Sequence, residues 1–97
     1  MHIMVSWDIK ANGTRWNEIN DSLKEGFNRY SSQKVFPTLY IVKLNGPLDR
    51  NKIYESLVKQ ANQFQETIYF LVSPAMFYRY DGSLPADMWT QINQMTD

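Results

Sequence analysis

The chain has 97 residues, of which 43% are apolar and 14% aromatic, so it is long enough for one globular domain and is not composed like a disordered segment. Ten basic and ten acidic residues give a net charge of zero, which argues against a protein coated in basic charge for gripping phosphate backbones. The absence of cysteine excludes disulfides and thiolate metal sites, and no apolar run approaches the ~20 residues of a membrane span. The amino-terminal residues lack the pattern of a secretory signal, so we expect a cytoplasmic protein with a single domain over residues 1–97.

The first predicted element is a strand over residues 2–9. Its alternate positions differ in character, and one face is entirely apolar and is expected to line the core: Ile3, Val5, Trp7 and Ile9. The other face carries Ser6 and Asp8, and Asp8 lies just before the loop 10–13. The direction in which this carboxylate points is therefore the main functional question that the sequence raises.

A helix is predicted to follow Asn12-Gly13, with Thr14 as a plausible N-cap, because apolar residues then recur at intervals of three and four. These residues are Trp16, Ile19, Leu23, Phe27 and Tyr30. The next region, 33–44, is rich in β-branched and aromatic residues but contains Pro37, which cannot donate to a central ladder. We therefore predict two short strands, 33–36 and 38–44, joined by a bend.

A second helix is predicted after the turn Asn45-Gly46-Pro47, with Asp49 as a candidate cap and an apolar stripe made of Ile53, Leu57, Ala61 and Phe64. The segment 67–73 is a strong strand that Pro74 ends, and 76–80 is a weaker strand candidate. Ser83-Leu84-Pro85 then opens a short helix.

This order predicts an α+β, ferredoxin-like βαββαβ sandwich, with two helices on one face of an antiparallel sheet and an extra C-terminal strand and short helix. The opposite face of the sheet would then be open. It should alternate between apolar and polar residues if water covered it, but Met4 and Leu71 are apolar, and neither alternate set of residues in the strand 38–44 is polar. We therefore expect a cover, with a second copy of the chain and the C-terminal helix as the two candidates, and we predict a homodimer.

Three stretches carry a resemblance to a known superfamily: Ile3-Met4-Val5-Ser6-Trp7-Asp8-Ile9, Thr38-Leu39-Tyr40-Ile41-Val42-Lys43, and Ile68-Tyr69-Phe70-Leu71-Val72 with the aromatic-rich tail that follows. Together they resemble a superfamily of small ferredoxin-like proteins that includes CRISPR-associated protein two, virulence-associated protein D and the SinR-like proteins. The SinR-like branch is the most similar, because of the stretch at residues 40–43 and a late helix that contains Trp89.

The resemblance implies a ferredoxin-like homodimer. In the members with nuclease activity, strand-one aspartates of two protomers approach each other and are thought to hold a divalent metal, which here would be Mg²⁺ or Mn²⁺. Asp8 is the position that carries over, as the candidate catalytic and metal-binding residue. Its alternative role is to accept hydrogen bonds from the loop amides in an Asx turn.

Four further residues are candidates for binding nucleic acid: Ser6, Lys10, Arg15 and Arg79. Ser6 shares a face with Asp8, and Lys10 and Arg15 are the basic residues that follow it. Arg79 lies among the aromatic residues of 76–80, which could stack on bases or pair as an edge strand with a second copy. His2, the only histidine, is expected to be exposed and without a role.

Two functions remain open at this point. One is a dimeric, non-catalytic module that binds a partner protein or nucleic acid, and the other is a metal-dependent endonuclease, acting on RNA or DNA, with Asp8 at the dimer interface. No membrane partner and no small-molecule cofactor are expected.

Overall fold

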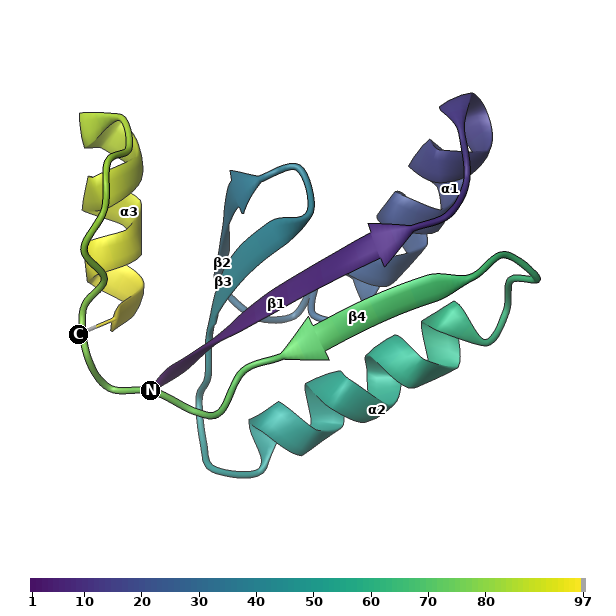
Figure 1. Cartoon of the computed structure of the whole chain (residues 1–97). Coiled ribbons are helices and arrows are strands. Elements are labelled where there is room, and N and C mark those ends of the chain that lie inside the picture. The colour runs from purple at the N-terminus through teal and green to yellow at the C-terminus, as the bar shows by residue number, and fades with distance from the viewer. Residues whose placement is uncertain (97) are drawn as a thin grey trace.

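The computed structural model describes residues 1–96 and contains a four-stranded sheet and three helices (Figure 1). In chain order the elements are β1 (His2–Ile9), α1 (Gly13–Glu25), β2 (Ser32–Phe36), β3 (Leu39–Lys43), α2 (Asp49–Ala61), β4 (Ile68–Val72) and α3 (Ala86–Thr96). No helix in this part of the chain combines the length and apolar character needed to cross a membrane.

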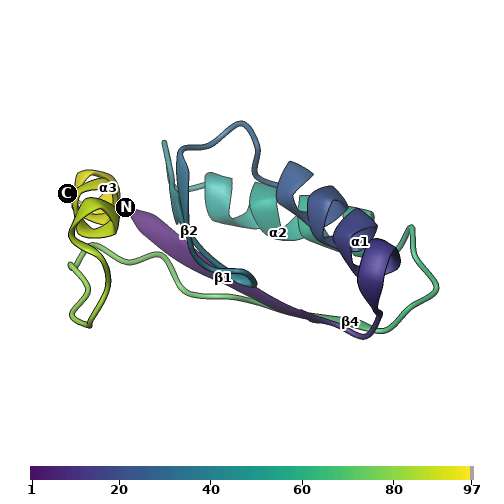
Figure 2. The same ribbon diagram turned by 90° about the horizontal axis from the view of Figure 1, so that it is seen from above.

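The strands are arranged in the order β2-β3-β1-β4, and every neighbouring pair is antiparallel. β1 is therefore a central strand, with Ser6 paired to Leu39 on one side and to Leu71 on the other. Helices α1 and α2 lie on the same side of the sheet (Figure 2). This α+β arrangement is broadly ferredoxin-like, as the order of predicted elements indicated.

The main core lies between the sheet and these two helices. The alternate residues of β1 that were predicted to face inward are all at most 5% exposed, and they pack against Leu23 of α1 and Leu57 of α2 within one buried cluster. In this core, every second residue of the strand packs against helix residues that are spaced three and four positions apart.

The turn predicted at Pro37 is confirmed. β2 ends at Phe36 and β3 begins at Leu39, so Pro37 lies in the tight connection, where its missing N–H costs no ladder bond. The pairing shifts register between Lys34 and Phe36, which is where the hairpin departs from a regular ladder.

The predicted strand over 76–80 is wrong for the chain by itself. Only Met76 pairs, in an isolated antiparallel bridge whose two backbone bonds to His2 measure 2.9 and 2.8 Å. Beyond Met76 the segment leaves the sheet, because Tyr80 packs against the buried cluster that contains Ile92 of α3. Tyr78 is 85% exposed.

Helix α3 covers part of the sheet face that α1 and α2 leave open. Ile92 and Met95 of α3 form a second buried cluster with Ile41 of β3, and Met4 and Val35 pack against its margin. Of the two covers expected from the sequence, the C-terminal helix thus accounts for the β2–β3 side of this face (Figures 1 and 2).

Replacing Ile92 tests this cover. Ile92 is fully buried, so Ile92→Ala should lower the free energy of unfolding by about 2 to 5 kcal/mol, because it removes apolar contacts and leaves a cavity. Denaturant unfolding followed by circular dichroism measures the change. The exposed Thr90 on the same helix is the control, and Thr90→Ala should stay within about 0.5 kcal/mol of wild type. Equal, small effects of both changes would show that α3 does not pack on the sheet.

Candidate functional site

The C-terminal end of β1 presents Asp8 on the sheet face that the helices α1 and α2 do not cover. The Asp8 side chain is 61% exposed, and its strand neighbour across the ladder is Tyr69. Ser6, one step earlier on the same face, is half-buried between Leu39 and Leu71. These β1 and β4 residues border a shallow hollow of about 350 Å³.

The nearest charge to Asp8 is Lys10. Its ammonium lies 2.7 Å from the Asp8 carboxylate, and this hydrogen bond raises the pKa of Lys10 above its ordinary value. Because both side chains are more than half exposed, water screens the pair and its effect on stability is small. The pair does cancel the positive charge that Lys10 would otherwise offer to a phosphate.

Arg15 belongs to a different contact. Its guanidinium donates to both carboxylate oxygens of Glu66 and to Glu18, and it lies over the Phe64 ring at 5.1 Å from the centroid. Hydrogen bonding to Glu66 raises the pKa of Arg15, and the same contact lowers the pKa of Glu66. Arg15 therefore ties the start of α1 to the segment before β4.

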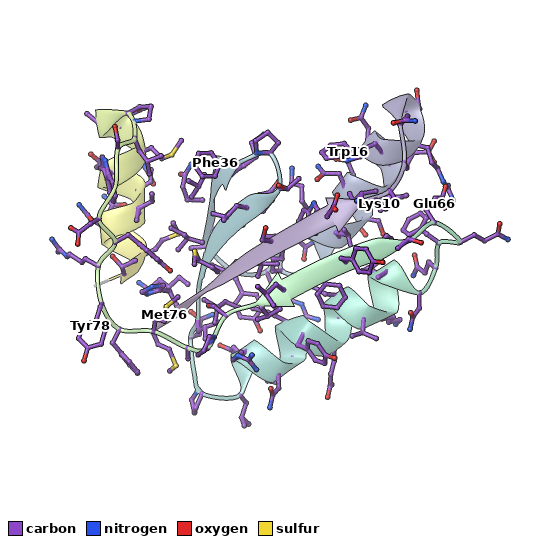
Figure 3. All side chains as sticks on the ribbon, in the orientation of Figure 1. Lys10, Trp16, Phe36, Glu66, Met76 and Tyr78 are labelled. Atoms are coloured by element: carbon purple, nitrogen blue, oxygen red, sulfur yellow. The ribbon has the colours of Figure 1, made fainter. Side chains whose placement is uncertain are left out.

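Arg79 lies near the other end of the sheet. It follows Met76, which pairs with His2, and the six steps of extended β1 from His2 to Asp8 span about 20 Å. Figure 3 shows the same separation, with Lys10 and Glu66 at one end of the molecule and Met76 and Tyr78 at the other. The structure thus groups Ser6, Asp8 and Lys10, but not Arg15 or Arg79.

One chain supplies few ligands for a metal at Asp8. Within residues 1–96, no group of three or more His, Asp or Glu side chains is placed to hold an ion. Magnesium is usually held by one or two carboxylates together with water molecules and substrate phosphates. A site with two protein carboxylates at Asp8 therefore requires the Asp8 of a second copy.

Next to Asp8 lies an apolar surface that the sequence had indicated only as an open sheet face. Phe36, Tyr69 and Leu71 are 55%, 63% and 74% exposed. The ladder places Phe36 opposite Leu39, Leu39 beside Ser6, and Ser6 beside Leu71, so these side chains form a row across all four strands. We refer to Phe36, Leu39, Ser6, Leu71 and Tyr69 as the sheet patch.

His2 contradicts the expectation that it is exposed. The side chain is fully buried, its ring lies 5.1 Å from the ring of Tyr80, and neither ring nitrogen has a hydrogen-bond partner among the described residues. Burial lowers the pKa of His2, and burial raises the pKa of Tyr80 to about 12. No local sequence signal marks His2, because it is buried by a segment more than seventy residues later in the chain.

Comparison with known proteins gave no match to a family model and no match to a curated protein.

Buried His2 makes stability depend on pH. The folded chain favours neutral imidazole, so below the ordinary pKa of 6.5 the unfolded chain binds more protons and the free energy of unfolding falls as the pH falls. The slope from this one group is at most ~1.4 kcal/mol per pH unit. Denaturant unfolding between about pH 8 and pH 5.5 measures it, a range above the titration of the carboxylates.

The control for this titration is His2→Leu, which removes the ionisable ring and leaves no buried donor without a partner. Its stability should change less than that of wild type over the same pH range. Identical pH dependence of the two proteins would contradict a role for His2.

Proposed function

We propose that this chain is a homodimeric, non-catalytic binding module, related to CRISPR-associated protein two, that uses the sheet patch as its dimer interface and binds a partner protein or nucleic acid. The observation that carries the proposal is the exposure of Tyr69 and Leu71, at 63% and 74%, on a sheet face of which α3 covers only the part around Ile41 and Met4. An exposed apolar row across a sheet is the kind of surface that proteins bury against a partner.

A second copy fits this surface for reasons of symmetry and charge. A two-fold axis brings the same patch of both copies together, so the patch must complement itself. The patch is apolar along its row and carries one acid and one base at its end, Asp8 and Lys10. Two copies in opposite directions could therefore exchange these ion pairs, and the zero net charge of the chain adds no overall repulsion.

The distribution of the basic residues supports a binding role over catalysis. Lys10 is paired with Asp8, Arg15 is held by Glu66 and Glu18, and Arg79 lies at the far end of β1. Hydrolysis of a phosphodiester is helped by cations that are placed together around the phosphate, where charge develops in the transition state. Around Asp8 these residues do not form such a group.

Leu71→Glu tests the interface. The wild-type chain should have twice its monomer mass by light scattering at micromolar concentration. Leu71→Glu should raise the dimer dissociation constant by at least about 100-fold, because two like charges would face a shared apolar surface.

Leu48 provides a matched control, since it is 67% exposed and lies before α2, away from the sheet patch. Leu48→Glu should leave the mass unchanged. A wild-type chain that is monomeric at these concentrations, or a Leu48→Glu dimer as weak as Leu71→Glu, would contradict the proposed interface.

A metal-dependent endonuclease is the second candidate, and the position of Asp8 favours it. This exposed carboxylate borders the sheet patch, so a two-fold interface there would bring two Asp8 side chains to the same region. Mg²⁺ or Mn²⁺ bound between them would polarise a phosphate and activate water. The protein itself would supply the two carboxylates that hold the ion.

Nuclease assays on single- and double-stranded RNA and DNA, with magnesium, with manganese and with chelator, separate the two candidates. The non-catalytic proposal predicts no cleavage by wild type under any of these conditions. Metal-dependent cleavage that disappears in Asp8→Asn, because the amide lacks the charge that the metal needs, would overturn it. Asp21→Asn, on the exposed face of α1, is the control that should behave as wild type.

A further inference from the structure

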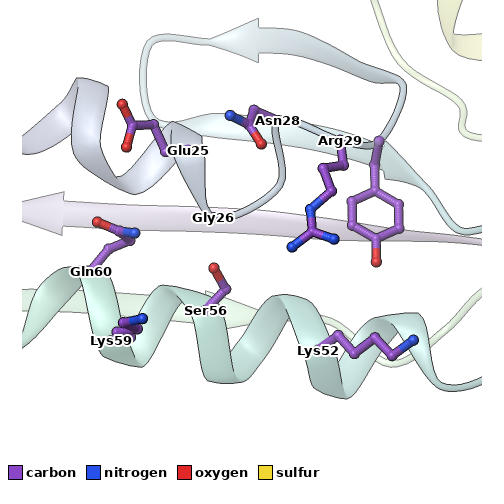
Figure 4. Close-up of a pocket in the computed structure, with 9 residues that line it drawn as sticks. Glu25, Gly26, Asn28, Arg29, Lys52, Ser56, Lys59 and Gln60 are labelled. Atoms are coloured by element: carbon purple, nitrogen blue, oxygen red, sulfur yellow. The ribbon is translucent and has the colours of Figure 1, made fainter.

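A polar cleft lies between α2 and the turn that follows α1, on the helix layer of the molecule (Figure 4). Its volume is about 410 Å³. Helix α2 contributes four residues spaced along one face: Lys52, Ser56, Lys59 and Gln60. The end of α1 and the following turn supply the opposite wall, from which Arg29 extends toward α2 (Figure 4).

The charges around this cleft are unbalanced. Arg29, Lys52 and Lys59 are cationic, and Glu25 is the one carboxylate in the lining. None of the three cations forms an ion pair with a described residue, in contrast to Lys10 and Arg15. The lining of this cleft therefore carries an excess of positive charge, although the net charge of the chain is zero.

Asp49 is the other acid nearby, and its carboxylate already has partners. It accepts hydrogen bonds from the backbone N–H groups of Asn45 and Gly46 at 2.7 and 2.8 Å, and from the Tyr30 hydroxyl at 3.3 Å. These bonds, chiefly the one from Asn45, lower the pKa of Asp49, with a smaller contribution from Lys52. Asp49 therefore offsets part of the charge of Lys52. The Lys52 ammonium does not donate a hydrogen bond to Asp49, so its N–H groups remain available to a ligand.

The walls of the cleft are held in place by the fold. Ser22 of α1 donates a 2.9 Å hydrogen bond to the Gln60 Oε1, which joins the two helices and leaves the Gln60 amide nitrogen as a donor. Gly26 permits the close approach of the end of α1, since a Cβ there would lie 3.0 Å from Leu57 Cδ2. These contacts fix the backbone of α2 against the end of α1, which lowers the entropic cost of ordering this wall around a ligand.

From this arrangement we infer that the cleft binds a phosphate group, carried either by a nucleotide or by a nucleic-acid strand. A planar guanidinium can bind two phosphate oxygens at once, and two ammonium groups add point charges from the other wall. The Ser56 hydroxyl and the Gln60 amide add neutral donors on the α2 wall. The volume is within the range of small-molecule sites, so a nucleoside monophosphate fits its size.

This site is separate from the sheet patch, because it lies on the helix layer and the patch lies on the opposite face of the sheet (Figures 2 and 4). Phosphate binding and dimerisation can therefore be tested independently. A negative result for phosphate binding does not bear on dimerisation, and the reverse also holds.

Titration of the full chain with AMP at low salt, followed by NMR or calorimetry, tests the inference. Saturable binding is expected, and adenosine, which lacks the phosphate, should not bind. Arg29→Gln and Lys52→Gln should each weaken AMP binding by at least about tenfold, since each removes a charge-assisted hydrogen bond. Glu25→Gln should tighten binding, because it removes the one carboxylate in the lining.

Lys43→Gln is the charge-matched control, since Lys43 is exposed on β3 and outside the cleft. It should bind AMP as wild type does. No saturable binding by the folded wild-type chain at millimolar AMP, or equal weakening by Lys43→Gln and Arg29→Gln, would overturn the site.

Two further probes distinguish the sources of the phosphate. Inorganic phosphate should compete with AMP at the same site. A labelled single-stranded RNA that binds more tightly than AMP, and loses that affinity with Arg29→Gln, identifies a nucleic-acid strand as the carrier. An RNA that does not bind, with AMP retained, identifies a nucleotide.

Discussion

The structure depends on the register of β1 between its two antiparallel neighbours. With Val5 opposite Tyr40 and Val72, every odd-numbered residue of β1 faces the helices and every even-numbered one faces the other way. A shift of one residue would move Trp7 out of the core and Asp8 into it, at a cost that the fold could not sustain. This single constraint sets both the core and the exposed position of Asp8.

The same constraint divides the second face of the sheet into two parts. At the N-terminal end of β1, Met4 lies beneath the cluster that α3 forms with Ile41, and His2 is enclosed beside Tyr80. At the C-terminal end, Ser6 and Asp8 stay accessible next to Leu71 and Tyr69. The chain therefore closes one part of this face with its own last helix and leaves Tyr69 and Leu71 exposed on the other part.

The elements set by local periodicity could be predicted from the sequence, whereas contacts between distant segments could not. The stripes around Leu23 and Leu57, and the break at Pro37, each follow from a pattern within one short stretch. The burial of His2 could not be predicted, because it depends on where the segment after Pro74 runs. The basic cleft could not be predicted for a similar reason: Arg29 and Lys59 are thirty residues apart, and no local spacing shows that they line opposite walls of one cleft.

In the proposed dimer the sheet patch, and not the helix layer, joins two copies. Because the chain has no cysteine, a single spin label can be placed by Lys10→Cys beside the patch or by Lys59→Cys on α2. Packed sheets lie about 10 Å apart and each helix layer adds about 10 Å, so the distance between Lys10→Cys labels should be well below that between Lys59→Cys labels. Electron spin resonance measures both distances; a shorter distance at position 59, or no coupling at either position, would contradict the account.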